Sequence, residues 1–348
     1  MKHPKVTIVG AGNVGATTAS LLLLKDLADV VLIDVADGIA KGKALDLMHM
    51  RLNECYTSTV VGTGDYKDTA NSDIVVVTAG VARKPGMTRE DLIGINSSII
   101  RNVLEGALPA SPDALYLFVT NPLDVMVNLA FRLSGLPANR LFGMGGVLDS
   151  ARFAYAIAQE TGASPESIDA LVIGAHGEAM LPLPRFSTVD GVSVTELLDD
   201  VALERVAHNT VQGGAAVVEL LQTGSAFYAP ASSIVRMIET ILRDTVEASA
   251  ATPATAQAAT PATAQAATSA TAQAATSATA PVVTPAPLSV CAYLNGEYGI
   301  EDVYMCVPVH LGAAGVAKVI ELDLNETELA QLQGSAAAIK KQLATIVN

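Results

Sequence analysis

The sequence predicts an α/β protein in two parts, a doubly wound parallel sheet first and a mixed α/β domain second. Over the first 145 residues, short apolar runs of β type alternate with stretches of helical composition, which is typical of parallel sheets wound on both faces. After about residue 145 the alternation loosens. Because 348 residues suffice for two domains, we expect one domain in residues 1–145 and a second in residues 146–348.

The elements of the first part follow one another in strict alternation. The predicted strands are residues 5–9, 30–34, 73–78 and 115–120. The predicted helices are residues 16–25, 39–50, 88–106 and 123–134. Such an order places the carboxyl ends of the strands at one edge of the sheet, where doubly wound folds bind their ligands.

The second part is predicted to be a mixture of helices and strands. Its predicted helices are residues 148–161, 194–221, 232–245 and 325–347. Its predicted strands are residues 170–174, 288–294 and 302–309. At the start of the last helix, Asn325 precedes Glu328 by three residues, which is the spacing of a helix-capping pair.

A low-complexity insertion interrupts the second part at about residues 248–287. Residues 248–280 hold 17 alanines and no charged side chain, and a unit Ala-Ala-Thr-Pro/Ser-Ala-Thr-Ala-Gln recurs every eight residues. Without Leu, Ile or Phe, this segment cannot bury enough apolar surface to offset the entropy of ordering it. We therefore expect a disordered loop in a surface turn between a helix and a strand, with nothing in favour of a binding role.

Charge and hydropathy exclude several classes of partner. With 35 acidic and 21 basic side chains the net charge is −14, so the molecule repels a phosphate backbone and nucleic acid is not expected as a partner. Although the mean hydropathy is +0.40, no run of 18 apolar residues occurs, and no membrane span is expected. Three cysteines without metal-ligand spacing, and an N-terminus without a signal-peptide pattern, predict a reduced, cytoplasmic protein with no metal site.

A glycine-rich turn follows the first predicted strand. Gly10, Gly12 and Gly15 have the spacing Gly-x-Gly-x-x-Gly between a strand and a helix, so the N–H groups there can meet a pyrophosphate at the positive helix end. Asp34 ends the next strand, where a carboxylate accepts the hydroxyls of an adenosine ribose and repels a 2′-phosphate. The order strand, glycines, helix, strand, acid predicts a Rossmann domain that binds NAD rather than NADP. The alternative is a tight turn followed by an ordinary acid.

An arginine-containing segment, residues 83–89, follows the third predicted strand. Thr88 can cap the next helix together with Asp91. The loop would carry Arg83 and Arg89 beside the nicotinamide end of the cleft. Taken alone, these two arginines are equally well explained as solvated surface charge.

A carboxylate, a guanidinium and an imidazole form a further candidate site. Asp149 and Arg152 stand three residues apart on one face of a predicted helix, and His176 follows a buried strand. Taken singly, the first two are typical of a helix ion pair and the last of a structural histidine. Their interpretation depends on the rest of the sequence.

Six segments in chain order resemble the malate and lactate dehydrogenase family, and within it the lactate-dehydrogenase-like malate dehydrogenases of bacteria. Together they extend over nearly all of the chain except the insertion, which that family normally lacks. The segments are residues 8–15 (IVGAGNVG), 79–96, 119–124 (VTNPLD), 146–152 (GVLDSAR), 174–178 (GAHGE) and 223–226 (TGSA).

The resemblance implies an NAD-dependent oxidoreductase that interconverts (S)-malate and oxaloacetate, a reaction of the tricarboxylic acid cycle. His176 would be the proton acceptor, oriented by Asp149, and Arg152 would hold the carboxylate next to the reacting carbon. Arg89 would polarise the carbonyl, while Arg83 occupies the position that carries Gln in lactate enzymes and Arg in malate enzymes. The resemblance and the glycine motif together assign to the cofactor Gly10, Ala11, Gly12, Asn13, Val14, Gly15, Asp34, Asn96, Val119, Thr120 and Asn121, the last of which would also contact the substrate.

The chemistry of these side chains agrees with that assignment. Oxidation of a secondary alcohol needs a base for the hydroxyl proton, and imidazole titrates near working pH. Arg152 can offer two parallel donors to one carboxylate. Arg83 would do the same for a second carboxylate, so malate is expected to be preferred over lactate by several orders of magnitude.

Three alternatives remain open from the sequence. A lactate dehydrogenase or other 2-hydroxy acid dehydrogenase is the first, and Arg83 argues against it. A related NAD-dependent glycosidase would need a metal site of Cys and His, and no cysteine lies near His176 in the sequence. The third is a catalytically silent NAD-binding or structural protein, although every expected catalytic side chain is present. Because the family assembles as dimers or tetramers, a homodimer or homotetramer is expected.

Overall fold

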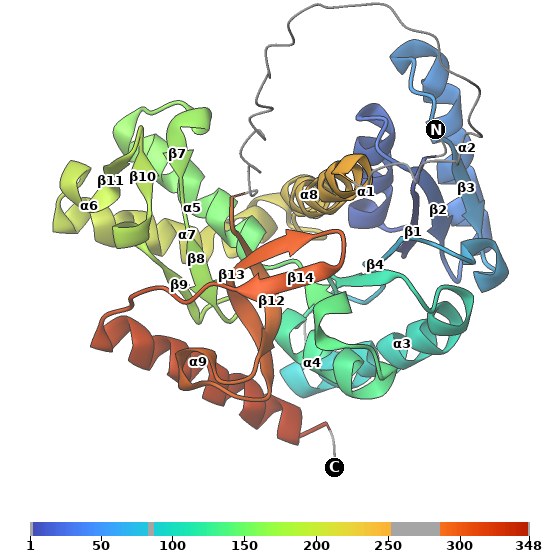
Figure 1. The fold of residues 1–348 in the computed structure, drawn as a ribbon. Coiled ribbons are helices and arrows are strands. Elements are labelled where there is room, and N and C mark those ends of the chain that lie inside the picture. The colour runs from blue at the N-terminus through green and yellow to red at the C-terminus, as the bar shows by residue number, and fades with distance from the viewer. Residues whose placement is uncertain (1–2, 83–86, 252–285, 347–348) are drawn as a thin grey trace, which may run out of the picture.

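A computed structural model describes residues 3–82, 87–251 and 286–346 (Figure 1). The strands are β1 Lys5–Val9, β2 Asp29–Ile33, β3 Val60–Thr63, β4 Ile74–Val77, β5 Leu115–Phe118, β6 Leu141–Gly143, β7 Ile168–Asp169, β8 Val172–Gly174, β9 Met180–Pro182, β10 Thr188–Val189, β11 Val192–Ser193, β12 Leu288–Leu294, β13 Val303–Gly312 and β14 Gly315–Val319. The helices are α1 Asn13–Leu24, α2 Asp37–Glu54, α3 Arg89–Ala110, α4 Leu123–Ser134, α5 Gly146–Thr161, α6 Val194–Leu197, α7 Asp200–Leu221, α8 Tyr228–Ala251 and α9 Glu326–Ala344.

The described chain is built on one eleven-stranded sheet with the order β3-β2-β1-β4-β5-β6-β12-β13-β8-β9, and β14 pairs with β13. The first six strands in that order are parallel, which is the doubly wound Rossmann arrangement, and the strands that follow pair antiparallel. The fold class predicted from the sequence, a Rossmann sheet followed by a mixed α/β part, is therefore confirmed. A separate three-stranded sheet, β11-β10-β7, lies at one end of the molecule (Figure 1).

The sheet continues without interruption across the predicted domain boundary. Cys291 of β12 pairs with Gly143 of β6, so the last parallel strand is joined directly to the antiparallel part. Helix α5 begins at Gly146, just after this strand. The division at residues 145 and 146 stays a prediction.

The core lies on both faces of the parallel strands. Every residue of β4 and β5 is buried, as expected for central strands with helices on both sides. Helix α8 packs beside α1, and α3 packs beside α4 (Figure 1). Because helices flank this part of the sheet, its functional side chains can be presented only at its edges.

Most predicted elements are confirmed, with local differences. Strand β3 was not predicted, because its four residues include Gly62 and have no alternating pattern, so the third predicted strand is β4. The helix predicted for residues 194–221 is two helices, separated where Leu198 is extended and Asp199 caps α7. The predicted capping pairs at Thr88 and Asn325 both form.

The predicted insertion begins later than expected. Helix α8 runs to Ala251, so residues 248–251 belong to a helix rather than to the loop. Strand β12 begins at Leu288. Residues 252–285, which carry the rest of the predicted insertion, lie outside the described residues.

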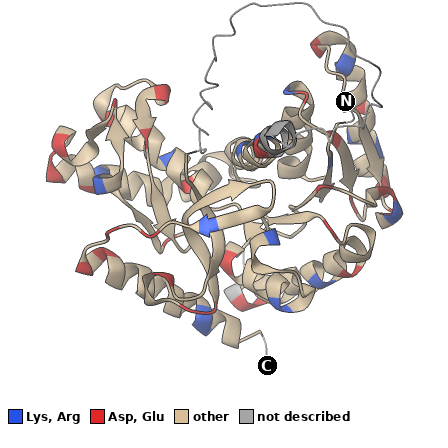
Figure 2. Cartoon of the chain, viewed as in Figure 1, with Lys and Arg blue, Asp and Glu red and all other residues tan. Residues whose placement is uncertain are grey.

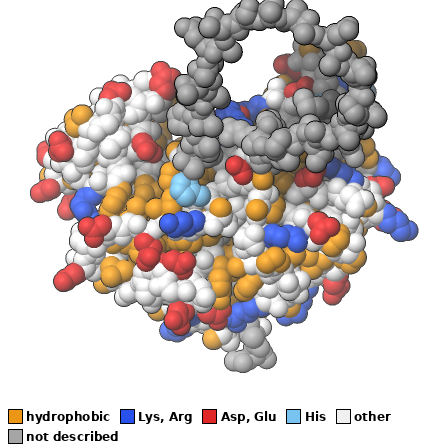
Figure 3. Space-filling model, in the orientation of Figure 1, with side chains coloured by type: hydrophobic (Ala, Val, Ile, Leu, Met, Phe, Trp, Pro, Cys, Tyr) orange, Lys and Arg blue, Asp and Glu red, His pale blue; other side chains and the backbone are white. Residues whose placement is uncertain are grey.

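Acidic side chains are spread over both halves of the molecule, in keeping with the net charge of −14 (Figures 2 and 3). Among the described helices, none is both long enough and apolar enough to cross a bilayer.

Candidate active site

A cleft lies at the carboxyl ends of β1, β4 and β5, the edge at which a doubly wound sheet binds ligands. Its cavity measures about 280 Å³. The segments that form it come from both parts of the chain, including the glycine turn, the ends of β4 and β5, the turn that holds His176 and the connection between α7 and α8. The predicted site residues that line it are Gly12, Asn13, Val14, Gly15, Val119, Thr120, Asn121 and His176.

The glycine turn leaves room for a phosphate. Gly10 has a φ of +109°, which favours glycine, and a Cβ at Gly15 would come 1.9 Å from the carbonyl oxygen of Gly10. A Cβ at Gly12 would meet nothing within 4 Å. The N-terminus of α1 at Asn13 therefore faces open space and can receive a pyrophosphate.

The carboxylate of Asp34 is held in place at the end of β2. Its Oδ2 accepts the N–H of Ala11 at 2.7 Å, and its Oδ1 accepts the N–H of Ala36 at 2.9 Å. The Nζ of Lys43 on α2 donates to the carbonyl of Ala11 at 2.7 Å, and this nearby cation was not identified from the sequence. The site combines a fixed negative charge with one adjacent positive charge.

Asn96 connects the loops that follow β4 and β5. Its side chain is buried, its Oδ1 accepts the N–H of Val81 at 2.9 Å, and its Nδ2 donates to the carbonyl of Asn121 at 2.6 Å. Thr120 donates to the carbonyl of Ala79 at 2.6 Å. These bonds fix the backbone on which Val119 and Asn121 line the cleft.

His176, Asp149 and Arg152 form a connected group beside the cavity. The Nδ1 of His176 lies 2.8 Å from Oδ2 of Asp149, and Nη1 of Arg152 lies 3.4 Å from Oδ1 of the same carboxylate. The Asp149 side chain is 1% exposed, whereas His176 is 15% and Arg152 19% exposed. A buried carboxylate thus orients the imidazole, which lines the cleft, and a partly exposed guanidinium beside it.

The surroundings of His176 favour its protonated form. Burial opposes the charged ring, but the charge and hydrogen bond of Asp149, with the charge of Asp124, outweigh that effect. The pKa of His176 therefore lies above its ordinary value. A ring held in this way can exchange a proton near neutral pH while its Nδ1 stays engaged by Asp149.

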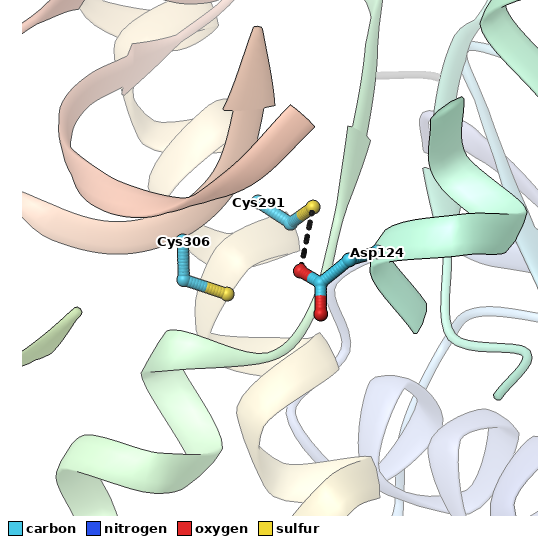
Figure 4. Close-up of side chains that lie close together, drawn as sticks. All are labelled: Asp124, Cys291 and Cys306. Atoms are coloured by element: carbon cyan, nitrogen blue, oxygen red, sulfur yellow. Dashed lines mark hydrogen bonds between the residues drawn. The ribbon is translucent and has the colours of Figure 1, made fainter. Parts of the chain in front are cut away.

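A second buried carboxylate, Asp124 of α4, contacts the main chain of His176. Figure 4 shows its side chain beside those of Cys291 and Cys306. Its Oδ2 accepts the N–H of His176 at 2.9 Å, and the Cys291 thiol lies 3.6 Å from its Oδ1. Cys306 Sγ accepts the N–H of Gly146 at 3.2 Å. Sequence reasoning missed this group, because the pairing of β12 with β13 brings Cys291 and Cys306 together and the packing of α4 against β13 adds Asp124.

Asp124, Cys291 and Cys306 have ligand atoms within 4.8 Å of one another, close enough in principle for a metal ion. Each of these side chains already has a hydrogen-bond partner: His176, Asp124 and Gly146, respectively. We interpret them as a hydrogen-bonded cluster behind the active site. The three ligand atoms that are grouped in the described chain include none from His176, so this cluster is not the Cys and His set that the glycosidase alternative would need.

Two predicted substrate residues are not placed by the structure. Arg83 lies outside the described residues, and Arg89 is described only as the first residue of α3. Their roles stay predictions.

Comparison with known proteins gives a consistent family match. Residues 4–143 match the model for the NAD-binding domain of lactate/malate dehydrogenases, and residues 146–263 and 255–348 match the α/β C-terminal domain of the same family. A protein named malate dehydrogenase from Roseiflexus castenholzii is 43% identical over 344 residues, 99% of each chain.

Solved structures show the same similarity. The malate dehydrogenase of Salinibacter ruber has a TM-score of 0.83 at 38% identity, with 98% of this chain and 97% of that chain covered. The lactate dehydrogenase of Cryptosporidium parvum, solved with lactic acid and nicotinamide adenine dinucleotide, has a TM-score of 0.84 at 32% identity, with 100% and 99% covered. Malate and lactate dehydrogenases share this fold, so the fold alone does not identify the substrate. Individual side chains and the relatives of higher identity distinguish between the two.

Proposed function

The chain belongs to the lactate/malate dehydrogenase family and is an NAD-dependent malate dehydrogenase, and we propose that it oxidises (S)-malate reversibly to oxaloacetate with His176 as the proton acceptor. The observation that supports this role most directly is the 2.8 Å contact between His176 Nδ1 and Asp149 at the wall of the cleft. It leaves Nε2 of the ring free to take the hydroxyl proton of the substrate.

Asp149 prepares His176 for this step. With its Oδ2 on Nδ1, the carboxylate selects the tautomer in which Nε2 is unprotonated, and it stabilises the imidazolium that forms when the proton arrives. Because Asp149 is almost fully buried, its orientation does not depend on solvent. In the reverse direction the same imidazolium returns the proton to the alkoxide oxygen.

Arg152 would bind the carboxylate next to the reacting carbon. Only Nη1 of its guanidinium is engaged by Asp149, at 3.4 Å, and the remaining donors can form the paired N–H contacts that carboxylates prefer. Fixing the substrate in this way brings its hydroxyl to His176 and converts an encounter into an oriented reaction.

The cleft fits the nicotinamide cofactor. Gly12 to Gly15 would hold its pyrophosphate and Asp34 its adenosine ribose, while Asn96, Val119, Thr120 and Asn121 would form the nicotinamide end. When bound, NAD accepts the hydride that leaves the substrate carbon.

Arg83 and Arg89 complete the proposed site. Arg89 would polarise the carbonyl oxygen and Arg83 would pair with the second carboxylate of malate. The test is to follow NADH absorbance with oxaloacetate and pyruvate side by side. Activity confined to oxaloacetate is expected; a preference for pyruvate would make the chain a lactate dehydrogenase, and inactivity with both would favour a silent NAD-binding protein.

A homo-oligomer, dimer or tetramer, is part of this proposal. Large apolar side chains on α2 are exposed in the isolated chain, with Leu45 at 58% and Leu52 at 89%, and their spacing of seven residues puts them on one helix face. Light scattering of the purified protein gives the number of copies.

A cytoplasmic location is also proposed, because Cys55, Cys291 and Cys306 are all free thiols, as expected in a reducing compartment.

A further inference from the structure

The structure surrounds His176 with two carboxylates rather than one. Asp149 contacts the imidazole ring, and Asp124 accepts the backbone N–H of the same residue at 2.9 Å. We propose that Asp124 is a positioning residue for the proton transfer, which fixes the turn that carries His176 and stabilises the imidazolium. The inference rests on the proposed role of His176 as proton acceptor.

The turn that carries His176 needs such an anchor. It connects β8 to β9, and glycines with positive φ lie on both sides of the histidine, Gly174 at +90° and Gly177 at +116°. Glycine permits these conformations but does not enforce them. Asp124 belongs to α4 of the parallel half, so its bond with His176 ties the turn to the part of the chain that forms the cofactor cleft.

The cluster behind the turn is tightly packed. A Cβ at Gly145 would come 2.8 Å from Cys306 Sγ and 3.2 Å from His176 Cβ, so the histidine has little room to move backwards. Asp124 itself is 5% exposed. His176 is therefore held on its inner side by Asp124 and by the closely packed backbone of Gly145, which in turn lies against Cys306.

Burying the charge of Asp124 is energetically unfavourable, and this cost is explained if the charge stabilises the protonated ring of His176. Burial raises the pKa of Asp124 to about 6, although the charge and the N–H of His176 act in the opposite direction. A neutral side chain of the same shape would avoid that cost. Above pH 6 the ionised Asp124 instead places a second negative charge beside the ring that becomes positive during the reaction.

The described ionisable groups that face His176 come from four elements. Asp149 and Arg152 lie on α5, Asp124 on α4, and Cys291 and Cys306 on β12 and β13. Burial raises the pKa of the Cys291 thiol well above its ordinary value. The hydrogen bond with Cys291 lowers the pKa of the Cys306 thiol, but burial together with the charges of Asp124 and Asp149 raises it by more, so this pKa also lies above its ordinary value. Since both thiols stay neutral, Asp149 and Asp124 supply the negative charge and Arg152 opposes it.

The test replaces Asp124 by Asn and by Ala. Asp124→Asn keeps an oxygen that can accept the His176 N–H but removes the charge, so the pKa of His176 should fall by roughly 0.5–1 pH unit. In the pH–rate profile of malate oxidation, the limb that depends on neutral His176 should move to lower pH by the same amount. Asp124→Ala also removes the anchor and should lower kcat/KM for oxaloacetate about tenfold or more, with the Kd for NADH unchanged.

Two further measurements keep the outcome decisive. NMR titration of the His176 ring, identified by its loss in His176→Asn, reports its pKa even in a variant without activity and even if malate is not the substrate. Cys291→Ala keeps the carboxylate but removes a contact that favours its charged form, so it should move the pKa of His176 in the same direction as Asp124→Asn, by less. An unchanged pKa of His176 in both variants overturns the proposal, whatever happens to their thermal stability.

Discussion

The side chain of Arg152 lies directly against Gly213 of α7, where a Cβ would come 3.2 Å from its Cδ and 3.6 Å from its Cγ. At the next position, a Cβ on Gly214 would come 3.4 Å from Nη2 of the same arginine. Two consecutive glycines inside a 22-residue helix are unfavourable for the helix itself. Their positions are explained by the passage that they leave for the arginine, which is proposed to hold the substrate.

Replacing Gly213 by Ala should therefore lower the activity of the enzyme while making the helix more stable. The added methyl group should displace Arg152 and lower kcat/KM for oxaloacetate by roughly 2- to 10-fold, the range expected for a strained rotamer. The helix should gain roughly 0.5–1 kcal/mol from the better propensity of alanine. Gly334→Ala in α9 is the matched control, because a Cβ there meets nothing within 4 Å. Equal kinetics for the two variants would show that Gly213 does not serve Arg152.

The pH dependence of the reaction should follow the charge of His176. Malate oxidation needs the neutral ring, so its rate should rise with pH through a pKa above 6.5; oxaloacetate reduction needs the imidazolium and should fall with pH through the same pKa. His176→Asn should lower kcat by roughly 10²–10⁴-fold and remove this limb. Steady-state rates in both directions, measured from pH 5 to 9, provide the check. Opposite limbs that persist in His176→Asn would assign the proton transfer to another group.

Cofactor choice should depend on Asp34. Both its oxygens are fixed by backbone N–H groups, so its charge cannot turn away from a 2′-phosphate. NAD should be preferred over NADP, and Asp34→Ser should narrow the ratio of the two kcat/KM values by roughly tenfold or more, helped by the nearby Lys43. Asp37→Ser, at the start of α2, removes a similar charge and serves as the control. Similar use of both cofactors by the unaltered enzyme would contradict this assignment.

The low-complexity insertion should be dispensable for catalysis. Its composition offers neither charge nor large apolar side chains, and the described residues of the cleft all lie outside it. Replacing residues 252–285 with a short glycine-containing turn should leave kcat/KM within about twofold, since the free energy of closing a connection changes only slowly with its length. Activity and light scattering of the shortened chain measure the result. A large loss of activity or of assembly would show that the segment has a structural or binding role.

The sequence predicts features that depend on residues close together in the chain, but not contacts between residues far apart in it. The glycine turn, the strand that ends at Asp34 and the helix caps at Thr88 and Asn325 are set by neighbouring residues, and the structure contains all of them. Asp124 escaped notice because its partner His176 stands 52 residues away. No periodicity or short motif records such a contact.

The same distinction explains the second part of the chain. The pairing of Cys291 with Cys306 depends on the register of β12 on β13, and the contact of Arg152 with Gly213 depends on how α5 packs against α7. Both are long-range consequences of tertiary packing. Residue types at these positions were visible in the sequence, but their proximity was not.

Substrate choice should depend on Arg83. The rest of the proposed site, His176 with Asp149 and Arg152, handles the hydroxyl and one carboxylate that malate and lactate have in common, so it cannot distinguish between them. Only a cation that meets the second carboxylate can do so, and the family resemblance assigns that position to Arg83. A substrate with a methyl group there would leave the guanidinium unpaired in a closing site.

Arg83→Gln removes this charge and keeps hydrogen-bonding capacity. Oxaloacetate should lose roughly 2–4 kcal/mol of transition-state binding, about 30- to 1000-fold in kcat/KM, while pyruvate loses little. The oxaloacetate-to-pyruvate ratio should therefore collapse or invert, and the Kd for NADH should not change. Lys84→Gln, the neighbouring loop cation, is the matched control and should leave the ratio as it is. If Arg83→Gln keeps the full ratio, Arg83 is a solvated loop charge and recognition of the second carboxylate lies elsewhere in the cleft.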